Sequence, residues 1–335
     1  MRIIAFVIIL VLIFSVNIAF AGQALFYKEV NIIGGYSDRD DWVGKGDSLM
    51  NSIGFEDYRK FSNEYGDYLT TDLQVRFSYD SLEDSQDAWA VEIHNAWLEY
   101  KLGYGYNLKL GHFDPAFGLE PVLDTHGVLL QTLAMKNIGF KKDWGIALKG
   151  SLPKFDYKIA LQTGSGMSIR RKDGSHLLTA RIGSPLTQDF QYGVSFLYGE
   201  VLNTNGMSTF PKNHLLQDEA VIKKRIGLNA QYFYGSYSFK GEIAYGQDDG
   251  EDVLGYLFET DYTLPNHQNV QLELQFQSWI NDIHSGDTDD STLAAGISYK
   301  LNEDITLRAL VAHDFNLYGE KEDDKVLFQF YYFGS

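Results

Sequence analysis

Strict alternation between apolar and polar side chains is the feature that most constrains how this chain can fold. It is clearest in residues 69–79 and recurs in 155–162, 190–198, 270–277 and 305–311. Side chains of a β-strand point to alternate faces, so each of these segments has one apolar and one polar face. No helical pattern of comparable strength competes with it. The chain is therefore predicted to be all-β.

Two architectures produce such strands: a soluble sandwich with its apolar faces packed together, or a membrane barrel with its apolar face in lipid. Strands of about 9 to 13 residues favour the barrel, because a tilted strand needs about that length to cross a bilayer. Tyr and Trp recur at the strand ends, where a membrane barrel has its aromatic girdles. Short connections also alternate with long ones, as periplasmic turns and external loops do.

Counting these segments predicts a transmembrane antiparallel β-barrel of 16 strands, although 14 or 18 remain open alternatives. A strand near 25–36 and a weaker one near 53–62 begin the barrel, and both termini are expected in the periplasm. Residues 92–102 change phase, which predicts a β-bulge near His94 and Asn95.

Residues 1–21 have the pattern of a secretory signal peptide: Met1-Arg2, an apolar run, and the sequence Ala-Phe-Ala before the expected cleavage. A membrane anchor is the alternative, but polar residues interrupt the run and no basic flank follows it. Residues 22–335 are then one outer-membrane barrel. The chain has no cysteine, so an exported form does not rely on disulfides or thiolate metal sites.

One connection, residues 113–142, is much longer than the others and interrupts the strand pattern. Its prolines remove ladder donors, and its glycines permit backbone angles that other residues avoid. Loops of this length usually carry function, and the apolar residues of this one would be exposed unless it folded into the barrel. We predict an inward-folded constriction loop, with Asp114, Pro115, Phe117, Gly118, Glu120 and Lys136 as its candidate site residues.

Residues 111–120, G-H-F-D-P-A-F-G-L-E, also resemble the G-x-F-x-x-P-F-G-L-E type of segment found in the phosphate-selective porin family and related porins. The proline lies two residues before Phe117 here, rather than next to it. The resemblance implies a channel in the outer membrane of a Gram-negative cell and a homotrimer. Within 113–142 only three residues are basic, which argues against strong phosphate specificity.

The charge of the chain is strongly acidic, with 28 Lys and Arg against 45 Asp and Glu and a net charge of −17. A nucleic-acid partner is not expected, because it needs a basic footprint. The acids gather in the long connections, and none has the spacing of a calcium loop. On the strand faces turned to the lumen we place ten bases and six acids, which predicts a mild preference for anions. Alternatively, the loop acids are solvated tips and cross-strand pairs balance the lumen. The predicted pore-lining residues are Arg76, Lys109, Lys158, Arg181, Arg225, Lys240 and Arg308.

Motifs of catalysis are missing from the sequence. The eight His show no metal-ligand spacing, and no G-x-S-x-G motif occurs. We therefore predict no enzyme activity, no cofactor and no metal site. The predicted function is passive ion transport or diffusion of small hydrophilic solutes through an outer-membrane porin, whose partners are the lipid bilayer and those solutes. The alternative is a closed or plugged barrel with a structural, adhesive or receptor role.

Overall fold

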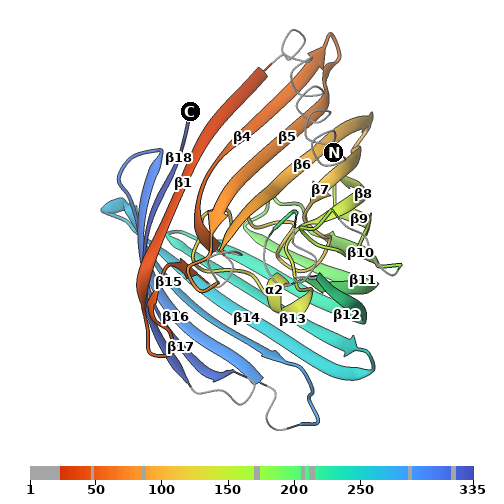
Figure 1. Ribbon diagram of the computed structural model, residues 1–335. Helices are drawn as coiled ribbons and strands as arrows, with labels where there is room; N and C mark the ends of the chain where they lie inside the picture. The colour runs from red at the N-terminus through yellow and green to blue at the C-terminus, as the bar shows by residue number, and fades with distance from the viewer. Residues whose placement is uncertain are drawn as a thin grey trace.

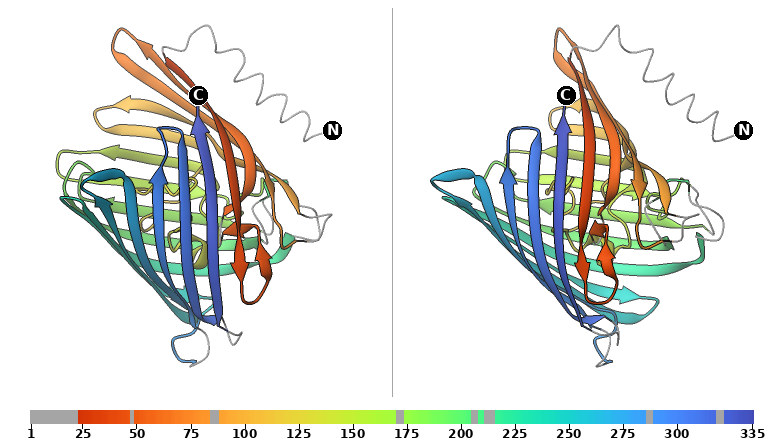
Figure 2. Two further views of the ribbon diagram at one scale, coloured as in Figure 1. Left: turned by 90° about the vertical axis from the view of Figure 1, so that its left-hand side faces the viewer. Right: turned by 60° about the vertical axis from the view of Figure 1, so that its left-hand side comes forward.

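The computed structural model describes residues 23–46, 49–83, 88–169, 174–204, 208–210, 216–285, 289–317 and 322–335. The predicted signal peptide lies outside these residues. The described strands form one closed antiparallel barrel (Figures 1 and 2). Because β1 pairs with both β4 and β18, the sheet has no free edge, and the soluble sandwich is wrong.

Eighteen strands occur among the described residues. Two of them, β2 (Asp41–Val43) and β3 (Lys45–Gly46), are short strands in the first long connection, and the other 16 form the wall. The wall strands are β1 (Gln23–Ser37), β4 (Leu49–Asn63), β5 (Gly66–Tyr79), β6 (Trp89–Gly103), β7 (Tyr106–Phe113), β8 (Asp143–Ser151), β9 (Asp156–Gln162), β10 (His176–Gly183), β11 (Phe190–Thr204), β12 (Leu216–Tyr234), β13 (Tyr237–Asp248), β14 (Glu251–Leu264), β15 (His267–Ile280), β16 (Asp289–Lys300), β17 (Ile305–Leu317) and β18 (Asp323–Gly334).

The predicted strand number and the predicted bulge are both confirmed. In the β5–β6 pair, Val75 lies opposite Ile93 and Gln74 opposite Asn95, so His94 is the extra residue. The bulge restores the alternation after the phase change, which keeps the polar side chains of β6 on the inward face.

The outer face of the barrel is apolar along the alternating positions. Phe196, Leu228 and Phe328 are 50 %, 56 % and 60 % exposed, as expected of side chains that meet lipid. Near the β12–β13 turn, the rings of Tyr237 and Tyr262 stack at 4.5 Å, which adds to an aromatic girdle. Among the described residues, no helix is long and apolar enough to cross a membrane.

The height of the wall is uneven. Strands β7 to β10 have 7 to 9 residues each, whereas the flanking β6 and β11 have 15. Two connections fill the resulting gap. The Thr209 N–H donates to the carbonyl of Val91 at 2.9 Å and its hydroxyl accepts from the N–H of Ile93, while the Leu202 N–H donates to the carbonyl of Gly164 at 2.8 Å. Loop residues thus complete the wall between β6 and β11.

Candidate functional site: the lumen and its inner segment

Residues 114–142, called the inner segment below, join β7 to β8 and lie inside the barrel. The segment begins by docking on inward-facing side chains of the wall. The Gly118 N–H donates to the Ser195 hydroxyl at 3.0 Å, and the Leu119 N–H donates to the Glu242 carboxylate at 2.8 Å. Gly118 has a φ of +60°, and a Cβ there would overlap the Glu242 carboxylate, so this contact requires glycine.

The inner segment then reaches the opposite wall. The carbonyl of Gly127 accepts hydrogen bonds from the Arg308 guanidinium at 2.7 Å and from the Gln329 amide at 3.0 Å. Next to it, the imidazole of His126 lies 3.1 Å from the carboxylate of Glu29. These wall residues come from β1, β17 and β18, so the segment crosses the full width of the lumen.

The return path runs through the short helix α2 (Ala134–Asn137), which lies within the barrel (Figure 1). Lys136 forms an ion pair with Asp290 of β16 at 2.9 Å. The side-chain oxygen of Asn137 accepts a hydrogen bond from Arg225 of β12 at 3.0 Å. The segment is therefore tied to the wall on several sides rather than at its ends alone.

Apolar packing explains why the inner segment lies inside. Phe117, Ile138 and Phe140 pack in a cluster with apolar inward-facing side chains of β10, β11, β13, β14 and β15. On the other side, Leu129 and Leu130 pack with apolar residues of β1, β4 and β16 to β18. Burial of these side chains stabilises the docked segment, since each large apolar side chain contributes about 1.5–3 kcal/mol when it leaves water.

Three cavities surround the tip of the inner segment, residues 121–125. The first, of about 500 Å³, lies beside β7 to β10, and the second, of about 380 Å³, is bordered by β4 to β7. The third, of about 250 Å³, lies beside β13 to β17. Because Pro121 and Val122 border the first two and Leu123 and Asp124 border the second and third, the cavities form a crescent around the tip.

The first cavity has a basic wall. Lys149, Lys158 and Arg181 are register partners on three successive strands, and Lys109 projects from β7 beside them. Two of these bases are paired: Lys158 with Asp114 of the inner segment, and Lys149 with a carboxylate of β6. The remaining positive charge is therefore smaller than the number of bases indicates.

Asp114 is the acid that the inner segment brings to this basic wall. Its burial opposes ionisation, but the ammonium groups of Lys158 and Lys109 outweigh that cost and hold the pKa of Asp114 well below its usual range. The carboxyl is thus charged at neutral pH and fixes the start of the segment.

The third cavity, on the opposite side of the tip, is lined by charges of both signs. Glu259, Asp261 and Glu273 project into it from β14 and β15. Lys240 forms ion pairs with Glu259 and, at 2.8 Å, with Asp261. Lys300 and Arg308 also border this cavity, so bases balance its acids.

Comparisons with known proteins show what this geometry resembles. No family model and no curated protein matches the sequence. Solved structures match over almost the whole chain. OmpT of Vibrio cholerae, in a form that lacks loop L8, has a TM-score of 0.68 at 13 % identity and covers 93 % of this chain and 99 % of its own. The anion-selective porin of Comamonas acidovorans has a TM-score of 0.65 at 10 % identity, with the same coverage. The outer membrane channel DcaP of Acinetobacter baumannii has a TM-score of 0.63 at 12 % identity and covers 94 % and 98 %.

The chain has the fold of the bacterial outer-membrane porins. At these identities the similarity establishes the porin fold and nothing finer. The resemblance to the phosphate-selective porin family stays a prediction, because no family model matches.

Six of the seven predicted pore-lining residues border a cavity of this porin fold: Arg76, Lys109, Lys158, Arg181, Lys240 and Arg308. Arg225 points inward but is covered by the inner segment, and its side chain is 0 % exposed. It donates to Asn137 of the segment and to Asp248 of β13. Its position links the segment to the wall, which the sequence pattern did not indicate.

The predicted excess of bases in the lumen is wrong. Asp248, Asp290 and Asp323 are among the acids assigned to the long connections, but they lie in strands and form inward ion pairs or hydrogen bonds. Further acids line the inside or belong to the inner segment: Glu29, Glu56, Glu92, Glu99, Asp114, Glu120 and Asp314. The alternation of side-chain faces along the strands could have identified several of these acids. Glu99, for example, lies on the same face as Trp97 once the bulge at His94 is taken into account.

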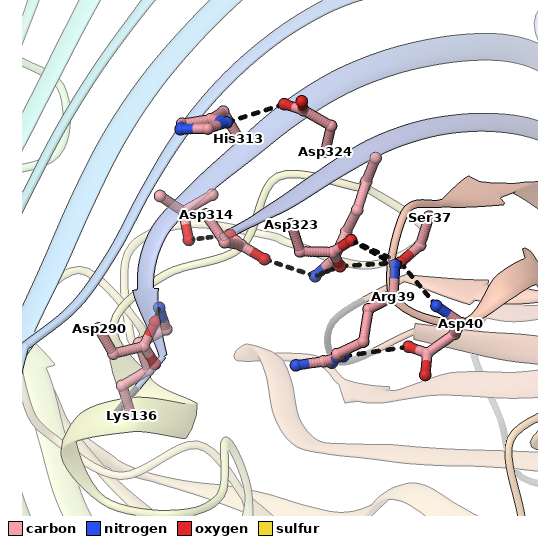
Figure 3. Close-up of polar contacts among 11 residues, drawn as sticks. Ser37, Arg39, Asp40, Lys136, Asp290, His313, Asp314, Asp323 and Asp324 are labelled. Atoms are coloured by element: carbon pink, nitrogen blue, oxygen red, sulfur yellow. Dashed lines mark hydrogen bonds and ion pairs between the residues drawn. The ribbon is translucent and has the colours of Figure 1, made fainter. Parts of the chain in front are cut away.

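Several acids near the ends of β1, β17 and β18 form a hydrogen-bonded network at the seam of the barrel (Figure 3). Asp323 accepts from the Ser37 hydroxyl at 2.7 Å and from the Arg39 N–H at 3.1 Å. Lys325 lies 2.7 Å from Asp314 and 3.7 Å from Asp323. The network joins β1 to β17 and β18. In the part of the chain that the structure describes, no group of three or more His, Asp or Glu could hold a metal ion.

Proposed function

We propose that this protein is a porin of the bacterial outer membrane that lets small hydrophilic solutes or ions diffuse passively. One observation carries the proposal: polar and charged cavities surround the tip of an inner segment within a closed barrel whose outer face is apolar. The outer face suits lipid, and the lumen suits hydrophilic solutes.

The inner segment is proposed to be the constriction. Asp114 and Glu120 border the second cavity, while Phe117, Gly118 and Lys136 hold the segment against the wall and Pro115 is buried beside them. In this arrangement the tip sets the width of the passage, and the docked residues keep the tip in place.

A mild anion preference is proposed on the basic wall of the first cavity. Lys109 forms no ion pair with the residues that the structure describes, and Arg181 donates a hydrogen bond to Asn229, so their charges act on a passing ion. The similarity in fold to an anion-selective porin is compatible with this preference. The preference is expected to be small, because Lys158 and Lys149 are neutralised by carboxylates.

The remaining expectations belong to the same proposal. The protein is proposed to act without a cofactor and without enzyme activity, and its partners are lipid and the permeating solutes. A homotrimer is proposed from the sequence resemblance, and one of the similar structures is described as a trimer form.

A planar-bilayer recording tests the proposal. The purified barrel is expected to give stepwise potassium chloride conductance, and deletion of residues 122–136 is expected to raise the size of the step. A deletion variant that folds and shows unchanged steps would place the constriction elsewhere.

A second function, a plugged barrel with a structural, adhesive or receptor role, is favoured by the two apolar clusters that fix the inner segment. Silence of both the intact protein and the deletion variant would support this second function over the pore.

A further inference from the structure

The second cavity is bordered by a buried carboxyl group and a buried amino group that form no ion pair with any side chain the structure describes. Asp72 of β5 is 3 % exposed, and its Oδ1 atom has no hydrogen-bond partner. Lys109 of β7 is 7 % exposed. Both side chains border the same cavity of about 380 Å³. An ionisable group that is buried without a partner of opposite charge is costly, so a solute that supplies such a partner would be stabilised here.

The two groups come from the two strands that flank β6, which carries Trp97. Asp72 is the register partner of Trp97 on β6, and the ammonium group of Lys109 lies 3.8 Å from the centre of the Trp97 ring. The side chain of Glu56, from β4, is in hydrogen-bond contact with Asp72. The cavity thus presents a pair of carboxyl groups, an aromatic ring and an ammonium group in sequence.

We propose that this cavity is a binding subsite for a small zwitterion of the α-amino acid class. The ammonium group of the solute would donate to Asp72 and Glu56, and its carboxylate would accept from Lys109. Charge-assisted hydrogen bonds of this kind are stronger than neutral ones, and both unpaired groups are satisfied by one molecule. The inference rests on the proposed diffusion function, because the cavity lies along the passage beside the tip.

The charges of the cavity explain why a zwitterion fits better than a simple ion. A free anion attracted by Lys109 meets the carboxyl groups of Asp72 and Glu56. A free cation attracted by these groups meets Lys109 and also Lys142, which borders the same cavity. Only a solute that carries both charges gains from both sides. The volume is within the range of small-molecule pockets, roughly 300–1,000 Å³.

A binding titration of the intact barrel in detergent tests the subsite. The probe is L-alanine, and the indole of Trp97 supplies a fluorescence signal that a Trp97→Phe variant assigns. Propionate lacks the ammonium group and ethylamine lacks the carboxylate. Propionate can therefore pair only with Lys109, and ethylamine only with the carboxyl groups. We expect alanine to bind at least tenfold more tightly than either analogue.

Substitutions test the acidic side and the basic side of the subsite separately, as the two analogues do. Lys109→Gln and Asp72→Asn should each weaken alanine binding about tenfold or more, and Glu56→Gln is the milder acid variant if Asp72→Asn does not fold. Lys300→Gln is the matched control, because it removes the same charge from the third cavity and should leave binding unchanged. Equal affinities for alanine and propionate, or equal effects of Lys109→Gln and Lys300→Gln, would overturn the proposal.

The binding assay does not require conduction. A barrel that conducts potassium chloride but shows no preference for alanine would refute the subsite alone. A barrel that shows the preference but stays silent in a bilayer would refute the diffusion function and leave the subsite supported.

Discussion

Replacement of Gly118 by alanine is expected to release the start of the inner segment from the wall. The backbone of Gly118 has a φ of +60°, and an added methyl group would overlap the carboxylate of Glu242. That carboxylate accepts the N–H of Leu119 at 2.8 Å. The substitution therefore strains the backbone and removes a hydrogen bond to a charged group in one step.

The magnitude follows from these two terms. The left-handed conformation costs an alanine about 1–2 kcal/mol. Loss of a hydrogen bond to a charged group costs about 1.5–3 kcal/mol. Together they weaken docking by about 2.5–5 kcal/mol, which decreases the ratio of docked to undocked segment by a factor of about 60 to 4,000.

Gly235→Ala is the matched control. Gly235 has a φ of +58° in the turn between β12 and β13, and an added Cβ would meet nothing within 4 Å. It carries the same backbone strain without the loss of the Leu119 hydrogen bond. The difference between the two variants isolates the contact with Glu242, about 1.5–3 kcal/mol.

Hydrogen exchange at the Leu119 amide measures the release, because its protection depends on the docked state. Exchange should accelerate strongly in Gly118→Ala and stay near the unmodified rate in Gly235→Ala. Single-channel records of Gly118→Ala should also show larger current fluctuations. Equal exchange rates at Leu119 in the two variants would refute the reasoning.

Three further outcomes are expected. Arg181→Gln should shift the reversal potential in a potassium chloride gradient modestly toward cation preference. Because the inner segment covers the Arg225 side chain, Arg225→Gln should loosen the segment and shift the reversal potential little. Equal shifts in the two variants would contradict this expectation. Burial, reinforced by the Arg76 guanidinium, lowers the pKa of His126. The docked segment therefore binds fewer protons than the undocked segment. Docking should weaken as the pH falls below about 6.5, the usual pKa of a histidine. Current noise should rise with acid, and less so in His126→Gln. Thr209→Pro removes the N–H that closes the wall onto β6, which should cost about 0.5–1.5 kcal/mol of stability in urea unfolding of the folded barrel.

The wall of the barrel could be predicted because its determinants are local. Alternation in residues 69–79 placed Arg76 on the inward face, and the change of phase near His94 placed the bulge. Both depend on the period of a strand, which neighbouring residues show directly. The glycine at position 118 was also identified correctly as a site of unusual backbone conformation.

The contents of the lumen depend on contacts between distant residues, which a single sequence does not reveal. The sequence pattern predicts that Arg225 lines the pore, but in the structure Asn137, 88 residues away, covers it. The sequence pattern assigns Asp323 to a long connection, but the hydroxyl of Ser37, from the other end of the chain, donates a hydrogen bond to it, and Asp323 is buried. Pairing across such separations decides which charges remain free, so selectivity could not be counted from the strands alone.

The path of the inner segment has a consequence for the order in which the protein folds. Its near end docks on Ser195, a residue of the middle of the wall, but its far end needs partners from both termini of the chain. Glu29 belongs to the first strand and Gln329 to the last, and the two strands meet only when β1 pairs with β18. Residues 126–127 can therefore make both sets of contacts only when β1 and β18 are paired, so we expect this part of the segment to dock as or after the barrel closes.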